Sequence, residues 1–204
     1  MMNKTYSALL ALLLVWSTAA QLPFPGRLTF SLADNALSAQ GFTCLHNEGY
    51  HNVNLRVYKM SNPAGLDVNG IKGLNNVATT ALGYGAYMEV CRGIDAATQV
   101  NDVFNAISSV LYGNLLVKIV EFNSKTDDSR CSWTGYTQAE NCAFIIGLLA
   151  DVGNTGYFNP YVHSTTHIWN TYFGSNCNAA AVSNARNTYL SYESYLPNGE
   201  VNAV

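Results

Sequence analysis

The sequence predicts an α/β protein built as a parallel β/α barrel, and three observations support this fold class. Apolar strand-like segments alternate with amphipathic helical segments, which is typical of parallel β-α units joined by right-handed crossovers. The segment LLVKIVEFN at 115–123 is largely aliphatic. It then ends on Glu121 and Asn123, and acidic residues at the carboxyl end of a buried strand are how a parallel barrel forms its active site.

The first half of the chain gives three strand signals and three helix signals. The clearest helix carries apolar residues at helical spacing from Val100 to Leu111, with Asp95 as its expected N-cap. The helix before it has apolar residues from Ile71 to Leu82. In chain order we expect a strand at 27–33, a helix at 38–50, a strand at 52–60, a helix at 69–85, a strand at 86–92 and a helix at 95–113.

The second half continues the same alternation. In order we expect the strand at 115–123, a helix at 136–155, a strand at 156–162, a short helix at 163–174 and a strand at 187–195. No linker, internal repeat or low-complexity tract interrupts this series, so residues 21–204 are interpreted as one domain.

The N-terminus has the features of a secretory signal peptide. Lys4 precedes a short apolar run from Leu9 to Trp16, and small residues follow up to Ala20. The run is too short to span a membrane, and we expect cleavage after Ala20. The protein is therefore expected to be secreted, or delivered to lysosomes or phagosomes.

The composition limits the classes of molecule that this protein is expected to bind. A net charge of −3 with only ten Lys and Arg argues against nucleic acid, and no later segment is apolar for long enough to span a bilayer. The thirteen tyrosines suit a polar, uncharged substrate. His163 and His167 have helical spacing but lack the acidic residue of a zinc-binding helix, so neither a metal site nor a cofactor is expected.

Five cysteines occur, which in a secreted chain permits disulfides and leaves at least one thiol without an intramolecular partner. Cys131 and Cys142 flank a ten-residue segment, SWTGYTQAEN. The interpretation from this proximity is a local disulfide between these two residues.

Four segments carry a resemblance to a known family. They are GFTCLHNEGYHNVNLRVYK, DVNGIKGLNNVATTALGYGAYMEV, TGYFNPYVHSTTHIW and YLSYESY, in that order. Together they resemble the invertebrate and protist branch of the glycoside hydrolase family 25 lysozymes, over roughly residues 28–195. The resemblance implies a parallel β/α barrel and an ancestor that cleaved peptidoglycan as an N-acetylmuramidase.

The sequence departs from the family pattern where the family carries its acids. The family aspartate at the end of the first strand falls at or near Ser31, with Asp34 a few residues later. The family's Asp-x-Glu on the fourth strand has two registers here. Either Glu121 takes the Asp position and Asn123 the Glu position, or Glu121 takes the Glu position and Ile119 the Asp position.

The family barrel also has two strands after YLSYESY, whereas this chain continues for nine residues; the barrel is thus incomplete at the C-terminus or closes with fewer strands.

These observations give two functional hypotheses. The first is a secreted lysozyme-like hydrolase of bacterial cell-wall polysaccharide, acting in antimicrobial defence or digestion, with Glu121 as general acid and Asp34 or Glu89 as further catalytic carboxylates. The second is a catalytically inactive carbohydrate-binding protein derived from a lysozyme. Candidate sugar-binding residues lie on the fourth, fifth and sixth strands and at their ends; they are Asn123, Tyr157, Asn159, Tyr161, Tyr192 and Glu193.

Overall fold

The computed structural model describes residues 28–33, 36–178, 189–195 and 201–203. Within these ranges one sheet has the strand order β1-β2-β4-β5-β6-β7-β8, with β3 paired to β2. Its strands are β1 (Leu28–Leu32), β2 (Tyr50–Lys59), β3 (Gly65–Leu66), β4 (Gly83–Glu89), β5 (Gly113–Lys118), β6 (Phe158–Thr165), β7 (Tyr189–Tyr195) and β8 (Val201–Ala203). The helices are α2 (Ala39–Asn47), α3 (Val68–Val77), α4 (Ala96–Ile107), α5 (Gln138–Asn154) and α6 (Thr166–Tyr172), with a 3₁₀ turn η1 (Ser129–Cys131).

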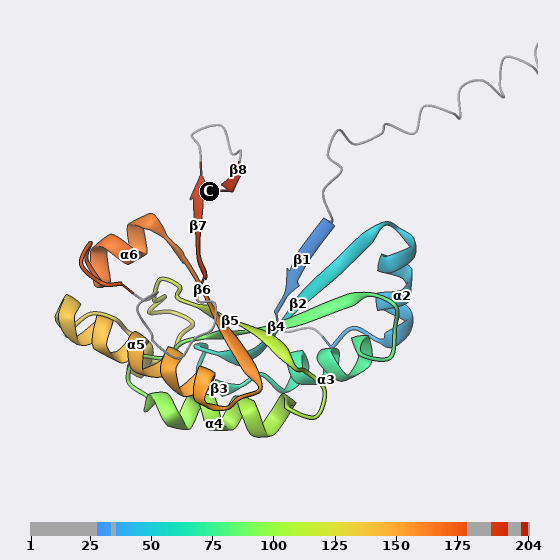
Figure 1. Ribbon diagram of the computed structural model, residues 1–204, viewed down its shortest axis with the longest axis horizontal. Coiled ribbons are helices and arrows are strands. Elements are labelled where there is room, and N and C mark those ends of the chain that lie inside the picture. Colours follow the sequence, from blue (N-terminus) through green and yellow to red (C-terminus); the bar gives the residue numbers. More distant parts are fainter. Residues whose placement is uncertain (1–27, 34–35, 179–188, 196–200, 204) are drawn as a thin grey trace, which may run out of the picture.

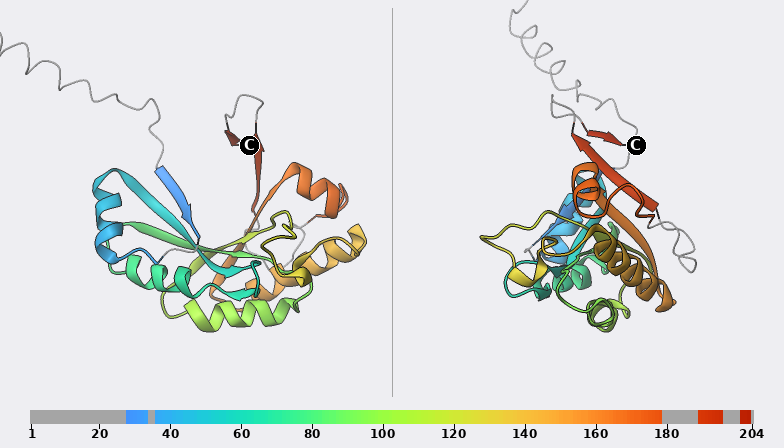
Figure 2. Two further views of the ribbon diagram at one scale, coloured as in Figure 1. Left: turned by 180° about the vertical axis from the view of Figure 1, so that it is seen from behind. Right: turned by 90° about the vertical axis from the view of Figure 1, so that its left-hand side faces the viewer.

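The sheet is parallel from β1 to β7 and curved. Only the pairs β2–β3 and β7–β8 are antiparallel among the described strands. The helices lie along the convex side of the sheet, and its two ends, β1 on one side and β7 with β8 on the other, rise on either side of the concave face (Figures 1 and 2). The α/β class and the parallel, barrel-like arrangement that the sequence predicted are therefore confirmed.

The core lies between the convex face and the helices. Along β2, Val53, Leu55 and Val57 are fully buried, as the period of two of a strand requires when one face meets helices. Val103 and Ile107 of α4 are fully buried as well. Helix α3 approaches β2 so closely that a Cβ on Gly70 would overlap the carbonyl oxygen of Arg56.

Several predicted boundaries were wrong. The helix expected at 69–85 ends at Val77, where the hydroxyls of Thr79 and Thr80 donate to the carbonyls of Asn76 and Val77. The chain then enters β4 at Gly83.

The helix expected at 163–174 begins only at Thr166, because 163–165 complete β6. Strands β3 and β8 had no sequence prediction. The signal peptide lies outside the described residues, and no described helix is long and apolar enough to cross a membrane.

Candidate functional site

The concave face of the sheet is organised in cross-strand rows, because paired residues of neighbouring strands point to the same side. Nearest the carboxyl ends, Glu89 on β4 pairs with Lys118 on β5, and Lys118 pairs with His163 on β6. The next row contains Arg56, Tyr87, Leu116 and Tyr161. Charged and aromatic side chains therefore occupy the part of this face where a parallel barrel places its active site.

Glu89 is held by an ion pair. The Arg56 guanidinium donates through Nη1 to Glu89 Oε1 at 3.3 Å and through Nε to Asp67 Oδ2 at 2.8 Å. The backbone N–H of Met60 also donates to Glu89 Oε2 at 3.3 Å. Arg56 and Asp67 are buried, so this candidate catalytic carboxylate is positioned by a buried cation.

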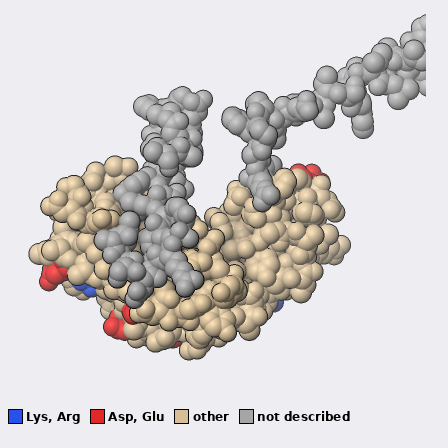
Figure 3. Space-filling view, viewed as in Figure 1, with Lys and Arg blue, Asp and Glu red and all other residues tan. Residues whose placement is uncertain are grey.

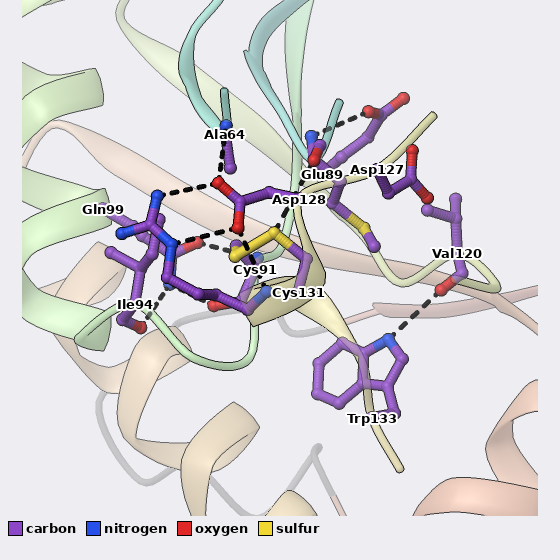
Figure 4. Close-up of a disulfide and its surroundings, with 12 residues drawn as sticks. Ala64, Glu89, Cys91, Ile94, Gln99, Val120, Asp127, Asp128, Cys131 and Trp133 are labelled. Atoms are coloured by element: carbon purple, nitrogen blue, oxygen red, sulfur yellow. Dashed lines mark hydrogen bonds and ion pairs between the residues drawn. A yellow bond between two sulfur atoms is a disulfide. The ribbon is translucent and has the colours of Figure 1, made fainter. Parts of the chain in front are cut away.

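Glu121 lies three residues beyond the end of β5, and its side chain is exposed. The preceding backbone is anchored, because Trp133 Nε1 donates to the carbonyl oxygen of Val120 at 3.2 Å (Figure 4). Trp133 is buried. Asn123 forms a turn: its side-chain oxygen accepts from Lys125 N at 3.0 Å, and its own N–H donates to Asp127.

The loop after Glu121 is fixed by Asp128. This carboxylate accepts from Arg130 Nη2 at 2.8 Å and from Ala64 N at 3.3 Å, while the Asp128 N–H donates to the carbonyl of Met60 (Figure 4). The hydrogen bonds from Arg130 hold the pKa of Asp128 well below its usual range, and in return Asp128 raises the pKa of Arg130. The loop that presents Glu121 and Asn123 is therefore tied to the end of β2.

The candidate sugar-binding residues do not all lie together. Asn159 and Tyr161 face the concave side within β6, in register with Asn114 and Leu116. Tyr157 instead precedes β6, at the amino end of the strand, and packs edge-on against Phe104. Tyr157 and Glu121 therefore lie at opposite ends of the sheet.

Three other candidates are only partly placed. The backbone of Tyr192 pairs with Ser164, and that of Glu193 pairs with Thr165 at the carboxyl end of β6. Their side chains lie outside the described structure, as does Asp34. By backbone register, Glu193 therefore belongs to the same end of the sheet as Glu89.

The disulfide prediction was wrong. Cys131 is bonded to Cys91 and Cys142 to Cys177, while Cys44 is free and exposed. Cys91 follows β4 and Cys131 lies in η1 after the neighbouring strand β5, so the sheet brings them together (Figure 4). Cys142 lies on α5, where it meets Cys177 from the segment after α6. Nearness in sequence was the wrong criterion.

Strand alternation also identifies two residues that the sequence analysis did not assign to the site. Lys118 and His163 alternate with buried Val117 and Val162, which places them on the concave face. Among the described residues, no cluster of His, Cys, Asp and Glu has the arrangement of a metal site. The site thus offers carboxylates, two cations and an imidazole around a polar surface.

Comparison with known proteins gives a family and a fold. The sequence model of the family described as Lysozyme-like protein 1 matches residues 31–203. No match was found among curated proteins.

Among solved structures, the fold is similar to that of a family 25 glycosyl hydrolase from Bacillus anthracis, with 14% identity, a TM-score of 0.55 and coverage of 84% of this chain and 83% of that one. It is also similar to a muramidase from Trichobolus zukalii, with 13% identity, a TM-score of 0.54 and coverage of 88% and 93%. A muramidase from Acremonium alcalophilum gives 12% identity, a TM-score of 0.51 and coverage of 87% and 91%. At these identities the likeness establishes the fold.

Proposed function

Because this chain belongs to the family of lysozyme-like protein 1, we propose that it is a secreted glycoside hydrolase that acts on bacterial peptidoglycan in defence or digestion. The observation that carries this proposal is the family match over residues 31–203. The parallel sheet supports it, since its concave face gathers polar groups at the carboxyl ends of the strands.

The proposed chemistry uses the groups at that end. Hydrolysis of a glycosidic bond needs a proton donor for the leaving oxygen and negative charge beside the oxocarbenium-like carbon. In the proposal Glu121 is the proton donor, since it is exposed beyond β5 on a segment anchored by Trp133. Glu89 supplies negative charge, and its pairing with Arg56 fixes its position.

A second candidate function is carbohydrate binding without cleavage, and one observation favours it. Lys118 lies beside Glu89 in the same row, and Arg56 already binds the Glu89 carboxylate. Because Arg56 also binds Asp67, two cations lie beside two carboxylates, which leaves less uncompensated negative charge than a pair of unpaired catalytic carboxylates provides. Asn123, at one of the two positions considered for the family acid, is a carboxamide that cannot act as a general acid.

The deciding experiment is a turbidity assay on bacterial cell walls between pH 4 and 8 with protein comprising residues 21–204. If Glu121 is the general acid, Glu121→Gln lowers turnover by about 10²–10⁴-fold while the circular dichroism spectrum stays unchanged. Glu48→Gln is the matched control, because Glu48 is an exposed acid at the end of α2. Equal lysis by wild type and Glu121→Gln would remove Glu121 from the mechanism.

The same preparation separates the two functions. Protein that does not lyse walls but co-sediments with insoluble peptidoglycan supports the binding function. Protein that does neither contradicts both.

Secretion is tested by N-terminal sequencing of exported protein, which should begin at Gln21; a retained Met1 would contradict the signal peptide.

A further inference from the structure

A row of carboxamides crosses the concave face near the amino ends of the strands, away from Glu89 and Glu121. Asn54 on β2 pairs with Gly85 on β4, and Asn114 on β5 pairs with Asn159 on β6. Because Ala86 pairs with Leu115, the residues preceding them, Gly85 and Asn114, continue the row. Strands β2, β5 and β6 thus present amide groups, with Gly85 of β4 between them, where a closed barrel is filled by aliphatic side chains.

The amide of Asn54 lies over Gly85. A Cβ built on Gly85 would lie 2.5 Å from Asn54 Oδ1, and a Cβ on Gly83 would overlap Asn52 Oδ1 in the same way. Glycine on β4 therefore leaves the space into which the two β2 carboxamides extend. Within the described part of the chain, no hydrogen bond engages the side chains of Asn52, Asn54, Asn114 or Asn159, although three of these residues are partly buried.

Three of these four carboxamides, those of Asn52, Asn54 and Asn114, line a cavity of about 470 Å³, which is within the usual range of about 300–1,000 Å³ for ligand sites. Besides Asn52, Asn54 and Asn114, its lining includes Thr29, Leu116 and Tyr161. No Asp, Glu, Lys or Arg is among the described residues that line it. In Figure 3 the charged side chains likewise lie along the margins of the visible described surface.

We propose that this cavity is a binding site for a neutral, polyhydroxylated ring, a saccharide unit, separate from the site at the carboxyl ends of the strands. A carboxamide offers both a donor and an acceptor, so a sugar hydroxyl can donate to Oδ1 and accept from Nδ2 of the same side chain. Tyr161 adds an aromatic surface for the apolar face of the ring.

Other ligand classes fit this cavity less well. An anion or a cation would lose its hydration shell on entering the cavity, and no opposite charge in the lining would compensate for that loss. An apolar ligand would leave the carboxamides desolvated and unpaired, which costs about 1–3 kcal/mol for each group. The proposed saccharide site does not depend on hydrolysis, because neither of the proposed catalytic residues, Glu121 and Glu89, lines the cavity.

The test is a ¹H–¹⁵N NMR titration of protein comprising residues 21–204 with N-acetylglucosamine and with its β-1,4-linked trimer. The expected result is a saturable shift of the side-chain NH₂ signals of Asn54 and Asn114. Asn54→Leu retains a similar volume but removes the amide, and it should raise the dissociation constant about tenfold. Asn105→Leu is the matched control, because Asn105 is an exposed asparagine on α4, on the convex side.

Two further variants keep the test informative. Asn114→Ala serves if Asn54→Leu fails to fold, because Asn114 is exposed at the start of β5. Gly85→Ala places a methyl group against the Asn54 amide and should also weaken binding.

Three outcomes would overturn the proposal. They are signal shifts confined to Lys118, His163 and their neighbours, the absence of any shift with either sugar, and unchanged affinity in both asparagine variants. Because the readout needs no lysis, its result is independent of the turbidity assay.

Discussion

Arg56 on β2 and Asp67 at the N-terminus of α3 form a buried ion pair, with Nε and Oδ2 2.8 Å apart. Asp67 is also the N-cap of α3 and accepts from Gly70 N at 3.1 Å through its other oxygen. The pair thus joins the strand to the helix that follows it. Through Nη1, the same guanidinium reaches Glu89 on β4, so one cation links the structural core to the candidate site.

Replacing Arg56 with Met should strongly destabilise the protein. The substitution leaves Asp67 as a buried carboxylate without its cation, and breaking a buried pair in this way costs about 3–5 kcal/mol. Denaturant unfolding at neutral pH measures the change. Lys72→Met on the exposed side of α3 is the control and should change stability by less than about 0.5 kcal/mol. Equal stability of the two variants would show that the ion pair contributes little.

Two glycine-to-alanine substitutions should have opposite effects. Gly70→Ala places a methyl group against the Arg56 carbonyl, so α3 must move away from β2 and stability falls. Gly147 lies within α5, and a Cβ there meets no atom within 4 Å. Gly147→Ala should therefore stabilise the protein by about 0.5–1 kcal/mol through helix propensity. Thermal unfolding of both variants tests the pair, and a stabilised Gly70→Ala protein would contradict the close approach of α3.

The disulfide map makes a third prediction. Under non-reducing conditions, peptide mapping should find Cys91 linked to Cys131 and Cys142 linked to Cys177. Cys44 should be the only cysteine alkylated in the folded protein. Removing the Cys91–Cys131 bond, which spans 40 residues, should cost about 4 kcal/mol by the chain-entropy relation. A peptide containing Cys131 linked to Cys142 would refute the map.

Local patterns in the sequence predicted the alternation of elements well. The aliphatic run before Glu121 and the apolar face of α4 reflect the burial of one side of a strand and one side of a helix, which follows from residue spacing alone. The helix at 69–85 was extended too far because Leu82 continues its apolar spacing, although the chain already turns at Thr79 and Thr80.

Features that depend on tertiary contacts were not predictable in the same way. Cys91 and Cys131 meet because β4 and β5 are neighbours in the sheet, which spacing along the chain does not reveal. Tyr157 was grouped with the candidate sugar-binding residues although it lies at the amino end of this strand, both in the expected range 156–162 and in β6. Residue spacing did not reveal that the amino end of this strand lies far from the segment that carries Glu121.

The last prediction concerns acid stability and Asp128. Hydrogen bonds from Arg130 lower the pKa of this buried carboxyl in the folded protein relative to its ordinary value of 3.8. A group with a lowered folded pKa contributes stability that is fully present above the unfolded pKa and is lost as the pH falls towards the folded value. The free energy of unfolding should therefore decrease progressively as the pH is lowered below 3.8.

Two variants isolate this contribution. Asp128→Asn should be less stable than wild type at neutral pH. Its free energy of unfolding should also decrease less than that of wild type as the pH is lowered. Arg130→Met removes the main cause of the shift, so the pKa of Asp128 should move back towards 3.8 and the part of the decrease that Asp128 causes should become smaller. Urea unfolding between pH 2 and 6 provides the comparison. An Asp128→Asn profile parallel to wild type over this range would mean that other carboxylates control acid unfolding, and that the tie between this loop and Arg130 adds nothing measurable to stability.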